Sequence, residues 1–401
     1  MNAPTIDSLH RTAKIELDEG RARTVEHMQR IVNQYVLQID VGCRVTSSAT
    51  HQAALLTAVN AARRAFIGGV RVRVRKDGPL IVRWAKGMSL SESVEAFGGT
   101  VVRSLSDEYC TLAIGNLPER PAGSRVLYIT WQGWSGGVVE EQADRLPETH
   151  GFPLAGMLAG ALGVSETFQH IRGYPVAGRR PVGLSLWDPT KDWRDESAFG
   201  AVGHYLLPSR LWLIGLGHLG QAYAWAVGLL PYSNPTEVSL MLQDFDTIAE
   251  ANESTGMLSD DSSVGRKKTR AVASRLEDLG FCTSISERTF DSCTQRSANE
   301  PGLALVGVDD PEPRHVLENA RFDLIVDAGL GGGPRSYLDI LVHSFPSGIQ
   351  AAAAWSGQRR SMEAAAADQP AYRALGHQIA ATTTQPEGEI RCGILELAGR
   401  S

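Results

Sequence analysis

The sequence is poor in cysteine and has no long apolar run, and each shortage argues against a class of protein. Its 401 residues include five scattered cysteines with no C-x-x-C pair, which argues against a disulfide framework and a structural zinc site. The sequence contains no run of about 18 apolar residues, so no transmembrane helix is predicted. The N-terminus lacks the apolar core of a signal peptide. We therefore expect a reduced, soluble, cytoplasmic protein with no membrane partner.

An excess of positive charge is also missing. The formal net charge is −6, so no global basic field would recruit nucleic acid. A basic run at residues 71–76 alternates arginine with valine. This alternation favours a strand with one solvated face over a nucleic-acid patch, and we expect no nucleic-acid partner.

The length predicts two or three domains, and 43% hydrophobic residues are enough for a buried core. The composition changes along the chain and divides it into five stretches. We expect a helical N-terminal segment (1–40) and then an α/β domain without a nucleotide fingerprint (41–175). A linker (176–207), a nucleotide-binding domain (208–345) and an irregular C-terminal segment (346–401) are expected to follow.

The first half is typical of an α/β layer. A helix is expected over 53–67 and a helix of small residues over 153–173, while a glycine-rich loop is expected at 131–137. Four strands are predicted, at 70–74, 80–82, 111–114 and 125–131. The glycine pair at 98–99 does not extend to G-x-G-x-x-G, so no nucleotide loop is expected in this half.

Residues 211–248 carry the strongest pattern in the chain. An apolar strand at 211–214 runs into Gly215, Gly217 and Gly220, and a helix is expected over 221–230. A second apolar strand at 238–242 ends in Asp244 and Asp246. Glycines let the backbone approach a nucleotide closely, and a helix N-terminus favours an anion. A carboxylate at the end of the second strand can accept hydrogen bonds from ribose hydroxyls. The pattern predicts a βαβ nucleotide-binding unit.

Further strands and helices continue this unit as a doubly wound sheet. Strands are expected at 283–287, 303–308 and 322–326, with helices at 266–279 and 315–320. Asp327 follows the last of these strands, where a role as a turn former is as consistent with the sequence as a role in the site.

With these motifs in place, the chain resembles the ThiF/MoeB/HesA superfamily of ATP-dependent enzymes that activate ubiquitin-like and sulfur-carrier proteins. The resemblance covers residues 208–335. Beyond the glycine loop, Lys268 lies 16 positions after Asn252 and three after Gly265. Arg314 lies five positions after Asp309. Each piece is common by itself, but the combination is specific.

The resemblance implies an α/β Rossmann-like fold and a second, degenerate α/β domain before it. It also implies adenylation of a carrier protein's C-terminal carboxylate, with ATP and Mg²⁺ as cofactors and pyrophosphate as a product. The resemblance implies that Gly215, Gly217 and Gly220 seat the nucleotide, and that Asp244 and Asp246 bind the ribose and the nucleotide. It also implies that Asn252 and Lys268 contact the phosphates and that Asp309 binds Mg²⁺.

The chain departs from the superfamily at three positions. Thr255 stands where an arginine is usual, and an arginine on a phosphoryl group can be worth roughly 10³-fold or more in rate. Arg266, Lys267, Arg23 or Arg30 are candidate substitutes. The milder departures are His218 in place of a glycine and Asp310 in place of an asparagine. A thioester step on a cysteine in the last part of the chain would have to use Cys392, for which a buried structural position is the simpler interpretation.

Two alternatives remain open from the sequence. The first is a catalytically degenerate nucleotide-binding scaffold, favoured by Thr255. The second is a nicotinamide dehydrogenase, disfavoured by the register of Lys268 and by the absence of an evident hydride-site constellation. We also expect a homo- or heterodimer partner. Because no apolar helix follows residue 397, we further expect that a closing helix is missing or comes from a partner.

Overall fold

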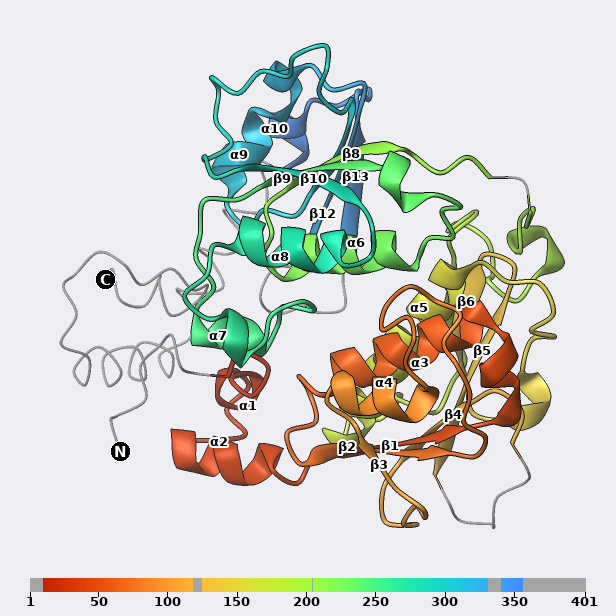
Figure 1. Cartoon of the computed structure of the whole chain (residues 1–401). Helices are drawn as coiled ribbons and strands as arrows, with labels where there is room; N and C mark the ends of the chain where they lie inside the picture. The colour runs from red at the N-terminus through yellow and green to blue at the C-terminus, as the bar shows by residue number, and fades with distance from the viewer. Residues whose placement is uncertain (1–9, 118–124, 204, 331–339, 356–401) are drawn as a thin grey trace. The chain divides into compact units, whose positions relative to one another are not determined.

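The computed structural model describes residues 10–117, 125–203, 205–330 and 340–355. Its internal contacts divide the chain into two units. The first unit takes the described parts of Met1–Arg21, Pro208–Trp225 and Asn234–Ser401, and the second takes those of Ala22–Leu207 and Ala226–Ser233. Figure 1 shows a separate sheet in each unit, and the units are described one at a time.

The second unit contains a seven-stranded sheet in the order β3-β2-β1-β4-β5-β6-β7. Five neighbouring strands are parallel, while β6 and β7 are antiparallel additions. The strands are β1 (Val36–Val41), β2 (Gly69–Val74), β3 (Thr100–Val101), β4 (Thr111–Ile114), β5 (Val126–Gln132), β6 (Ser135–Val139) and β7 (Val182–Ser185).

Three helices lie against one face of this sheet, namely α3 (Ala49–Ala62), α4 (Leu90–Ala96) and α5 (Pro153–Ile171). Small residues in α5 allow a close approach: a Cβ at Gly156 would lie 2.0 Å from the backbone oxygen of Thr50 in α3. Helix α3 is buried on nearly every side, because it packs on the sheet and on α5 at once. The helix expected over 53–67 is therefore present, but it begins earlier and is not amphipathic.

Several expectations for this half need correction. Residues 36–40, expected within the helical segment 1–40, belong to the fully buried interior strand β1. Residues 80–82 form no strand, since only Pro79 makes an isolated bridge there. The glycine-rich stretch 131–137 is a β-hairpin rather than a loop. Gly136 and Gly137 lie in β6, where any larger side chain would clash with α5 or β7. Within the stretch expected to be a linker, Val182–Ser185 pair with β6.

The first unit contains a six-stranded sheet in the order β10-β9-β8-β11-β12-β13. Five strands are parallel and β13 is antiparallel to β12. The strands are β8 (Arg210–Ile214), β9 (Ser239–Gln243), β10 (Cys282–Ser286), β11 (Leu303–Val306), β12 (Leu324–Leu330) and β13 (Ile340–Phe345).

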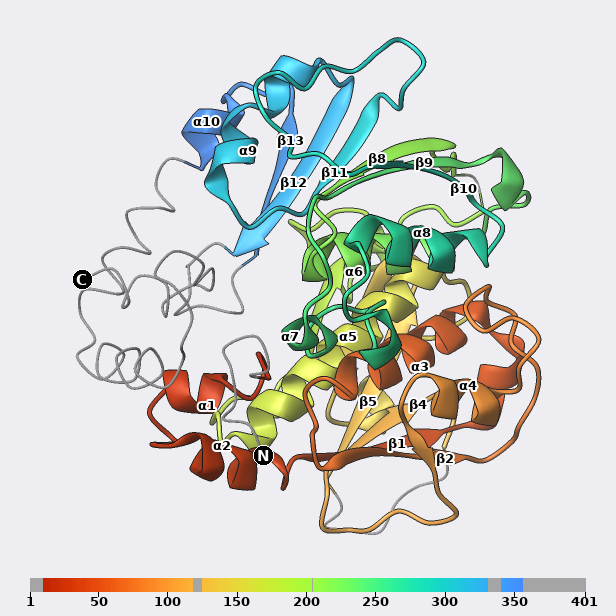
Figure 2. The same cartoon turned by 60° about the vertical axis from the view of Figure 1, so that its left-hand side comes forward.

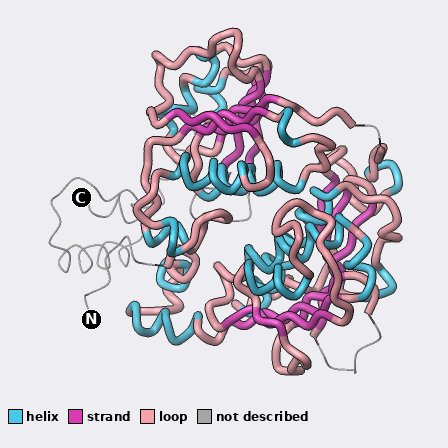
Figure 3. The backbone as a smooth tube through the Cα atoms, in the orientation of Figure 1, coloured by secondary structure: helices cyan, strands magenta, loops and turns pink. Residues whose placement is uncertain are grey.

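Helices cover both faces of this sheet (Figures 1 and 3), as in a doubly wound fold. On one face lie α6 (His218–Leu229) and α8 (Lys268–Glu277); on the other lie α9 (Pro311–His315), the 3₁₀ turn η7 (Leu317–Ala320) and α10 (Ala351–Ala354). The second face holds a core around Trp212, Phe322 and Phe345. The expected Rossmann-like sheet, with another α/β sheet earlier in the chain, is confirmed.

Three smaller expectations for this unit change. Asp327 is not a turn residue: it lies inside β12 and is fully buried. The helix expected over 315–320 is split between α9 and η7. A short helix, α1 (Ile15–Asp18), from the start of the chain belongs to this unit, while α2 (Val25–Val32) belongs to the other. Cys392 and the end of the chain lie outside the described residues.

No helix among the described residues combines the length and the apolar character needed to cross a membrane.

Candidate functional site

The carboxyl edge between β8 and β11 is the point where the strand order of the six-stranded sheet reverses. Ligands of open α/β sheets bind in the crevice at such a point. The glycine loop leaves β8 here, with Gly215 in the left-handed region at φ 79°. A Cβ on Gly220 would lie 1.8 Å from the oxygen of Gly215, and one on Gly307 would lie 2.8 Å from the nitrogen of Gly220. The loop is therefore packed against the end of β11 at backbone contact.

Gly217 differs from its neighbours in the loop. Its φ lies outside the left-handed region, and a Cβ placed on it would meet nothing within 4 Å. Protein packing therefore does not require glycine at this position. An absent side chain beside open space leaves the backbone accessible to a ligand, and the N-terminus of the 12-residue helix α6 begins at the next residue. The open side of Gly217 is the feature of the loop that fits a bound nucleotide.

Asp244 fixes the glycine loop from the end of β9. One carboxylate oxygen accepts the backbone N–H of Leu216 at 2.6 Å, and the other accepts that of Asp246 at 2.7 Å. The residue is only 8% exposed. Each carboxylate oxygen can accept a second hydrogen bond, so these bonds are compatible with the predicted contact to a ribose. Asp244 thus holds the loop in shape and remains beside it.

Asp246 and Lys268 form an ion pair across the same edge. The Lys268 ammonium lies 2.7 Å from an Asp246 carboxylate oxygen, and the Lys268 side chain is 10% exposed against 46% for Asp246. An isolated β-bridge between Thr247 and Lys267 joins the segment after β9 to the start of α8. The predicted phosphate-binding lysine therefore lies at the start of α8, with a half-exposed acid as its partner.

Asn252 has a structural role that the sequence pattern did not reveal. Its side-chain oxygen accepts the backbone N–H of Ala249 at 2.9 Å and closes the first turn of α7 (Glu250–Glu253). Thr255 follows in the turn after this helix, where its backbone N–H donates to the oxygen of Asn252. The predicted place of Asn252 beside the phosphates stays a prediction.

Asp309 and His218 lie on the exposed side of the crevice. Asp309 follows β11 and is exposed, and His218 begins α6. The surrounding protein desolvates His218 and lowers its pKa; Asp309 opposes this shift, and Lys268 adds to it. His218, which stands where the superfamily has a glycine, is therefore mainly neutral near pH 7.

Gln221 connects the glycine loop with the turn after α7, and sequence reasoning missed it. Its amide nitrogen donates to the oxygen of Leu216 at 3.2 Å, and its amide oxygen accepts the backbone N–H of Leu258 at 2.8 Å. Its amide nitrogen also lies 2.9 Å from the hydroxyl of Ser259. Gln221 is 1% exposed. A glutamine in an otherwise apolar helix was the available signal, because a buried amide needs partners.

Arg314 was singled out by its spacing from Asp309 without a role, and the structure shows its contacts. Arg314 donates to the backbone oxygens of Val308 and Ala328, at 2.6 and 3.0 Å, and its guanidinium stacks 4.0 Å over the ring of Trp355. Its Nε lies 3.5 Å from Asp327. Burial raises the pKa of Asp327 to about 6, and the attraction of Arg314 opposes that rise. Arg314 therefore ties the segment carrying Asp309 to β12.

The donor set at the crevice fits a magnesium–nucleotide complex. Among the described residues, no group of three or more His, Cys, Asp or Glu side chains could hold a metal ion. Mg²⁺ in nucleotide enzymes is commonly bound through one or two carboxylates and the substrate's phosphates. The exposed carboxylate of Asp309 has the chemistry of such a ligand. Four acids, Asp244, Asp246, Asp309 and Asp310, line or follow the strand ends of this edge, so a polyanion would require cations there.

A shallow hollow of about 320 Å³ lies elsewhere in the unit, between α8 and the edge strand β10. It is lined by Arg270, Ala273, Ser274, Glu277, Thr283, Ser284 and Ile285. None of the predicted site residues contributes to it, and its walls carry no feature of a nucleotide seat.

The corresponding point in the seven-stranded sheet lies between β1 and β4, and it is closed. A Cβ on Gly42 would lie 2.1 Å from the backbone oxygen of Asn116. Nearby, the buried His51 lies 2.8 Å from Glu148, whose carboxylate also accepts from Arg145. Arg44, just after Gly42, donates to the backbone oxygen of Glu148 at 3.1 Å. Backbone and side-chain groups of the protein therefore pack closely at this point of the sheet.

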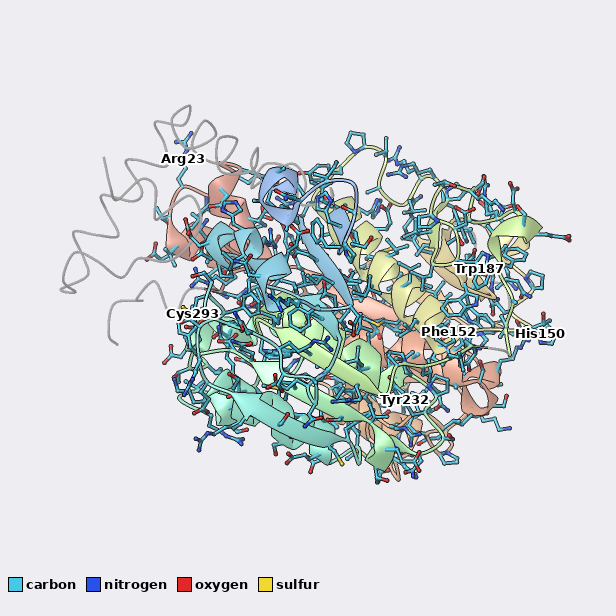
Figure 4. The ribbon with its side chains drawn as sticks, turned by 90° about the horizontal axis from the view of Figure 1, so that it is seen from above. Arg23, His150, Phe152, Trp187, Tyr232 and Cys293 are labelled. Atoms are coloured by element: carbon cyan, nitrogen blue, oxygen red, sulfur yellow. The ribbon has the colours of Figure 1, made fainter. Side chains whose placement is uncertain are left out.

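Aromatic side chains add a further feature to this unit. Trp134 lies 4.0 Å from Phe152 and 6.0 Å from Trp187, measured between ring centroids. Trp187 is 55% exposed, and Figure 4 labels both Phe152 and Trp187. The rings belong to the hairpin, to the residue that precedes α5 and to the stretch after β7, so they hold these three segments together.

Comparison with known proteins gives two family models that match the chain. The BilD N-terminal domain matches residues 36–186, and the BilD C-terminal domain matches residues 207–401. A relative from Collimonas sp. (strain OK412), "Bacterial E1-like protein BilD", is 42% identical over 402 residues. That match covers 98% of this chain and 84% of the relative.

Solved structures resemble only part of the chain. Escherichia coli MccB with ATP has a TM-score of 0.26 and 17% identity, over 31% of this chain and 38% of its own. E. coli tRNA N6-threonylcarbamoyladenosine dehydratase, TcdA, in complex with ATP has the same TM-score and identity, over 31% of this chain and 52% of its own. This chain thus spans about half or less of the length of these proteins, and likenesses at this level carry no argument about activity.

Proposed function

The chain belongs to the BilD family of bacterial E1-like proteins, and from this premise we propose that it is an ATP-dependent adenylyltransferase. Its substrate is the C-terminal carboxylate of a ubiquitin-like or sulfur-carrier-type protein. The observation that supports this most is the meeting of Gly217, Asp244 and Lys268 at the reversal point of the six-stranded sheet. An open backbone, a buried carboxylate and an ammonium group lie at one edge.

The proposed reaction joins two anions. A carboxylate oxygen of the carrier attacks the α-phosphorus of ATP, the bond from that phosphorus to the bridging oxygen breaks, and pyrophosphate leaves with the electron pair. Preorganised positive charge lowers the barrier of such a step, because it stabilises the charge that develops on the phosphate oxygens. In this proposal the glycine loop seats the nucleotide, Asp244 accepts from the ribose and Lys268 contacts the phosphates. Mg²⁺, held through Asp309, would supply further charge neutralisation.

Asp246 has a part in this proposal as the partner of Lys268. In the absence of nucleotide it holds the ammonium group at the edge. A pre-positioned charge pays less ordering entropy when the phosphates bind. His218 is neutral near pH 7 for the reasons given above, so it does not add to the positive charge there.

Pyrophosphate exchange into ATP tests the proposal. Purified full-length protein is mixed with MgATP, labelled pyrophosphate and a ubiquitin-like protein that ends in glycine, and label in ATP is counted. We expect exchange that depends on the carrier and falls by roughly 10²-fold or more in Asp309→Ala. A protein that binds ATP but gives no exchange with any carrier would be a scaffold. A protein that binds NADH and not ATP would be a dehydrogenase.

A further inference from the structure

The edge strand β10 of the six-stranded sheet is unprotected against pairing with another strand. It ends the sheet beside α8 (Figure 2), and among the described residues no strand pairs with its outer side. Its sequence, CTSIS, contains no charged residue and no proline, although these are common means of preventing edge-to-edge pairing. Ile285 on this strand is 42% exposed. An uncharged edge of this kind is suited to accept a further strand.

Free backbone groups lie at defined positions of β10. The N–H of Cys282 donates to the residue before β9 at 3.0 Å, and the carbonyl of Ser286 accepts from the residue after β9 at 3.1 Å. Successive residues of a strand direct their N–H and C=O groups to opposite sides, and those on the outer side of an edge strand are left for another partner. Thr283 and Ile285 therefore direct their backbone groups away from β9, to the outer edge.

The helix beside this edge presents a stripe of small and charged side chains. On the helix side, the hollow between α8 and β10 is lined by Arg270, Ala273, Ser274 and Glu277. Residues three and four positions apart are neighbours on a helix surface, so these four side chains share one face of α8. The two small residues form the middle of the stripe. Arg270 and Glu277, which are both exposed, form its oppositely charged ends.

Side-chain contacts fix how this stripe lies along the strand. At one end, Arg270 lies 2.8 Å from the carboxylate of Glu287, the residue that follows β10. At the other end, the hydroxyl of Thr283 donates to the carboxylate of Glu277. The helix and the strand therefore run in opposite directions, and the small middle of the stripe lies beside Ile285.

This surface is complementary to a second copy of itself. A twofold axis through Ile285 and perpendicular to the sheet would pair two β10 strands antiparallel and keep both copies of α8 on the same face. Each Arg270 would then lie opposite Glu277 of the second copy. The small residues in the middle of the stripe let two helices approach to the roughly 8–10 Å of packed helices. Twofold interfaces, in which one patch meets itself, are the commonest in soluble oligomers.

The charges decide which partner fits the edge. An extended peptide could pair with the free backbone groups of β10, but it would not answer an arginine at one end of the hollow and a glutamate at the other. A second copy supplies both opposite charges by symmetry. The guanidinium of Arg270 has five N–H donors, so its bonds to Glu287 leave donors for a second carboxylate.

We propose that two copies of this chain associate through β10 and α8 and join their six-stranded sheets into one continuous sheet. Ile285 lies opposite Ile285 of the second copy, and Thr283 lies opposite Glu287 of the second copy. Arg270 and Glu277 form an ion pair across the axis, once on each side of it. The inference goes beyond the proposed adenylation and does not depend on it, because none of these residues belongs to the glycine loop or its acids.

Sedimentation velocity of the full-length chain over a range of concentrations tests the proposal. We expect the wild type to form a dimer and Ile285→Lys to be monomeric, because two ammonium groups would meet at the axis. Arg270→Glu and Glu277→Arg should each raise the dimer dissociation constant by roughly 10-fold or more, since each places like charges opposite one another. The matched control is Arg275→Glu, which alters an exposed arginine of α8 that pairs with Asp260 outside the stripe. This control should leave the dimer intact.

A mixture of the Arg270→Glu chain with the Glu277→Arg chain gives the sharpest result. In a heterodimer of the two, both contacts across the axis again join opposite charges, so the mixture should associate more tightly than either variant alone. Thermal melting shows that each variant is folded, and misfolding cannot produce such a rescue. A wild type that stays monomeric at all concentrations would overturn the inference. A dimer that persists in folded Ile285→Lys, or a mixture that associates no better than its components, would overturn it as well.

Discussion

The two sheets of this chain have comparable carboxyl edges, and only one of them is open. At the edge of the six-stranded sheet, Gly217 faces empty space and its neighbours pack backbone to backbone. At the edge of the seven-stranded sheet, the carbonyl of Asn116 lies where a side chain of Gly42 would be. Packing requires glycine at position 42 but does not require it at position 217. A glycine that avoids a clash stabilises a fold, whereas a glycine without a steric reason points to a ligand.

Each sheet also carries a buried aspartate that faces arginine, and their environments differ. Asp40 in β1 accepts four hydrogen bonds of 2.5–3.1 Å from Arg73 and Arg75. Burial works to raise the pKa of Asp40, but these bonds outweigh it and the pKa is lowered. Asp327 has one arginine at 3.5 Å, and burial raises its pKa to about 6. The number and length of the hydrogen bonds that each carboxylate accepts therefore decide whether its pKa is lowered or raised.

The largest expected effect comes from Arg314→Met, which removes the cation facing Asp327. Breaking a buried pair typically costs about 3–5 kcal/mol. A raised folded pKa means that the folded state binds more protons than the unfolded state, so stability falls as pH rises through that range. The loss in free energy of unfolding should therefore be larger at pH 8, where Asp327 is charged, than at pH 5. Urea unfolding at both pH values measures it, and an equal loss at both would contradict the raised pKa.

Lys268→Met is expected to lower pyrophosphate exchange by roughly 10²–10³-fold, because it removes a preorganised charge from the phosphates. The matched control is Lys76→Met, which alters an exposed lysine just after β2 at the carboxyl edge of the other sheet. The control should leave exchange unchanged, since that edge is closed. Similar losses in both variants would remove the functional distinction between the two edges.

Glycine substitutions test the two edges directly. Gly42→Ala should destabilise the fold by about 1–3 kcal/mol, because its Cβ overlaps the Asn116 carbonyl and the backbone has to shift. Gly217→Ala meets nothing within 4 Å, so its melting temperature should stay near that of the wild type. Its affinity for MgATP, measured by calorimetry, should nevertheless fall. If Gly217→Ala melts lower and binds ATP equally well, its glycine has a structural purpose after all.

The smallest effect is expected for Asp40→Asn. The two arginine side chains that bind Asp40 are 25% and 26% exposed, so solvent screens the interaction and the loss should be about 1–2 kcal/mol at pH 7. A lowered folded pKa contributes stability above the unfolded pKa, and that contribution is lost as pH falls through the folded pKa. Denaturant midpoints of variant and wild type should converge on acidification. A difference that persists in acid would argue against a charge effect.

The site was predictable where the chemistry is local in the sequence. The glycine loop and Asp244 at the end of the second strand follow from spacing, and Lys268 at the start of a helix follows from the resemblance to the superfamily; the structure brings them to one edge. Gln221, the contacts of Arg314 and those of the N-terminal segment were not predictable in this way. Their partners lie at distant positions, such as Leu258 for Gln221 and Ser254 for Arg11, so no local pattern records the contact.

Strand β1 was missed for a related reason. Residues 36–41 are buried on both faces although Gln38 and Asp40 are polar, and they continue directly from a stretch that was expected to be helical. Gln38 is buried because its amide binds the backbone of Ser106, and Asp40 is buried because two arginines bind it. Polar side chains can enter a central strand when the fold supplies partners.

By itself, the sequence determined the βαβ unit, its glycine loop and the acids and lysine beside it, because backbone freedom and charge at fixed spacing are local properties. The tertiary structure alone decided which glycine is open, which aspartate is held by strong hydrogen bonds and which turn the N-terminal segment is bonded to. Those properties depend on atoms far apart in the chain, and only packing brings such atoms within a few ångströms of each other.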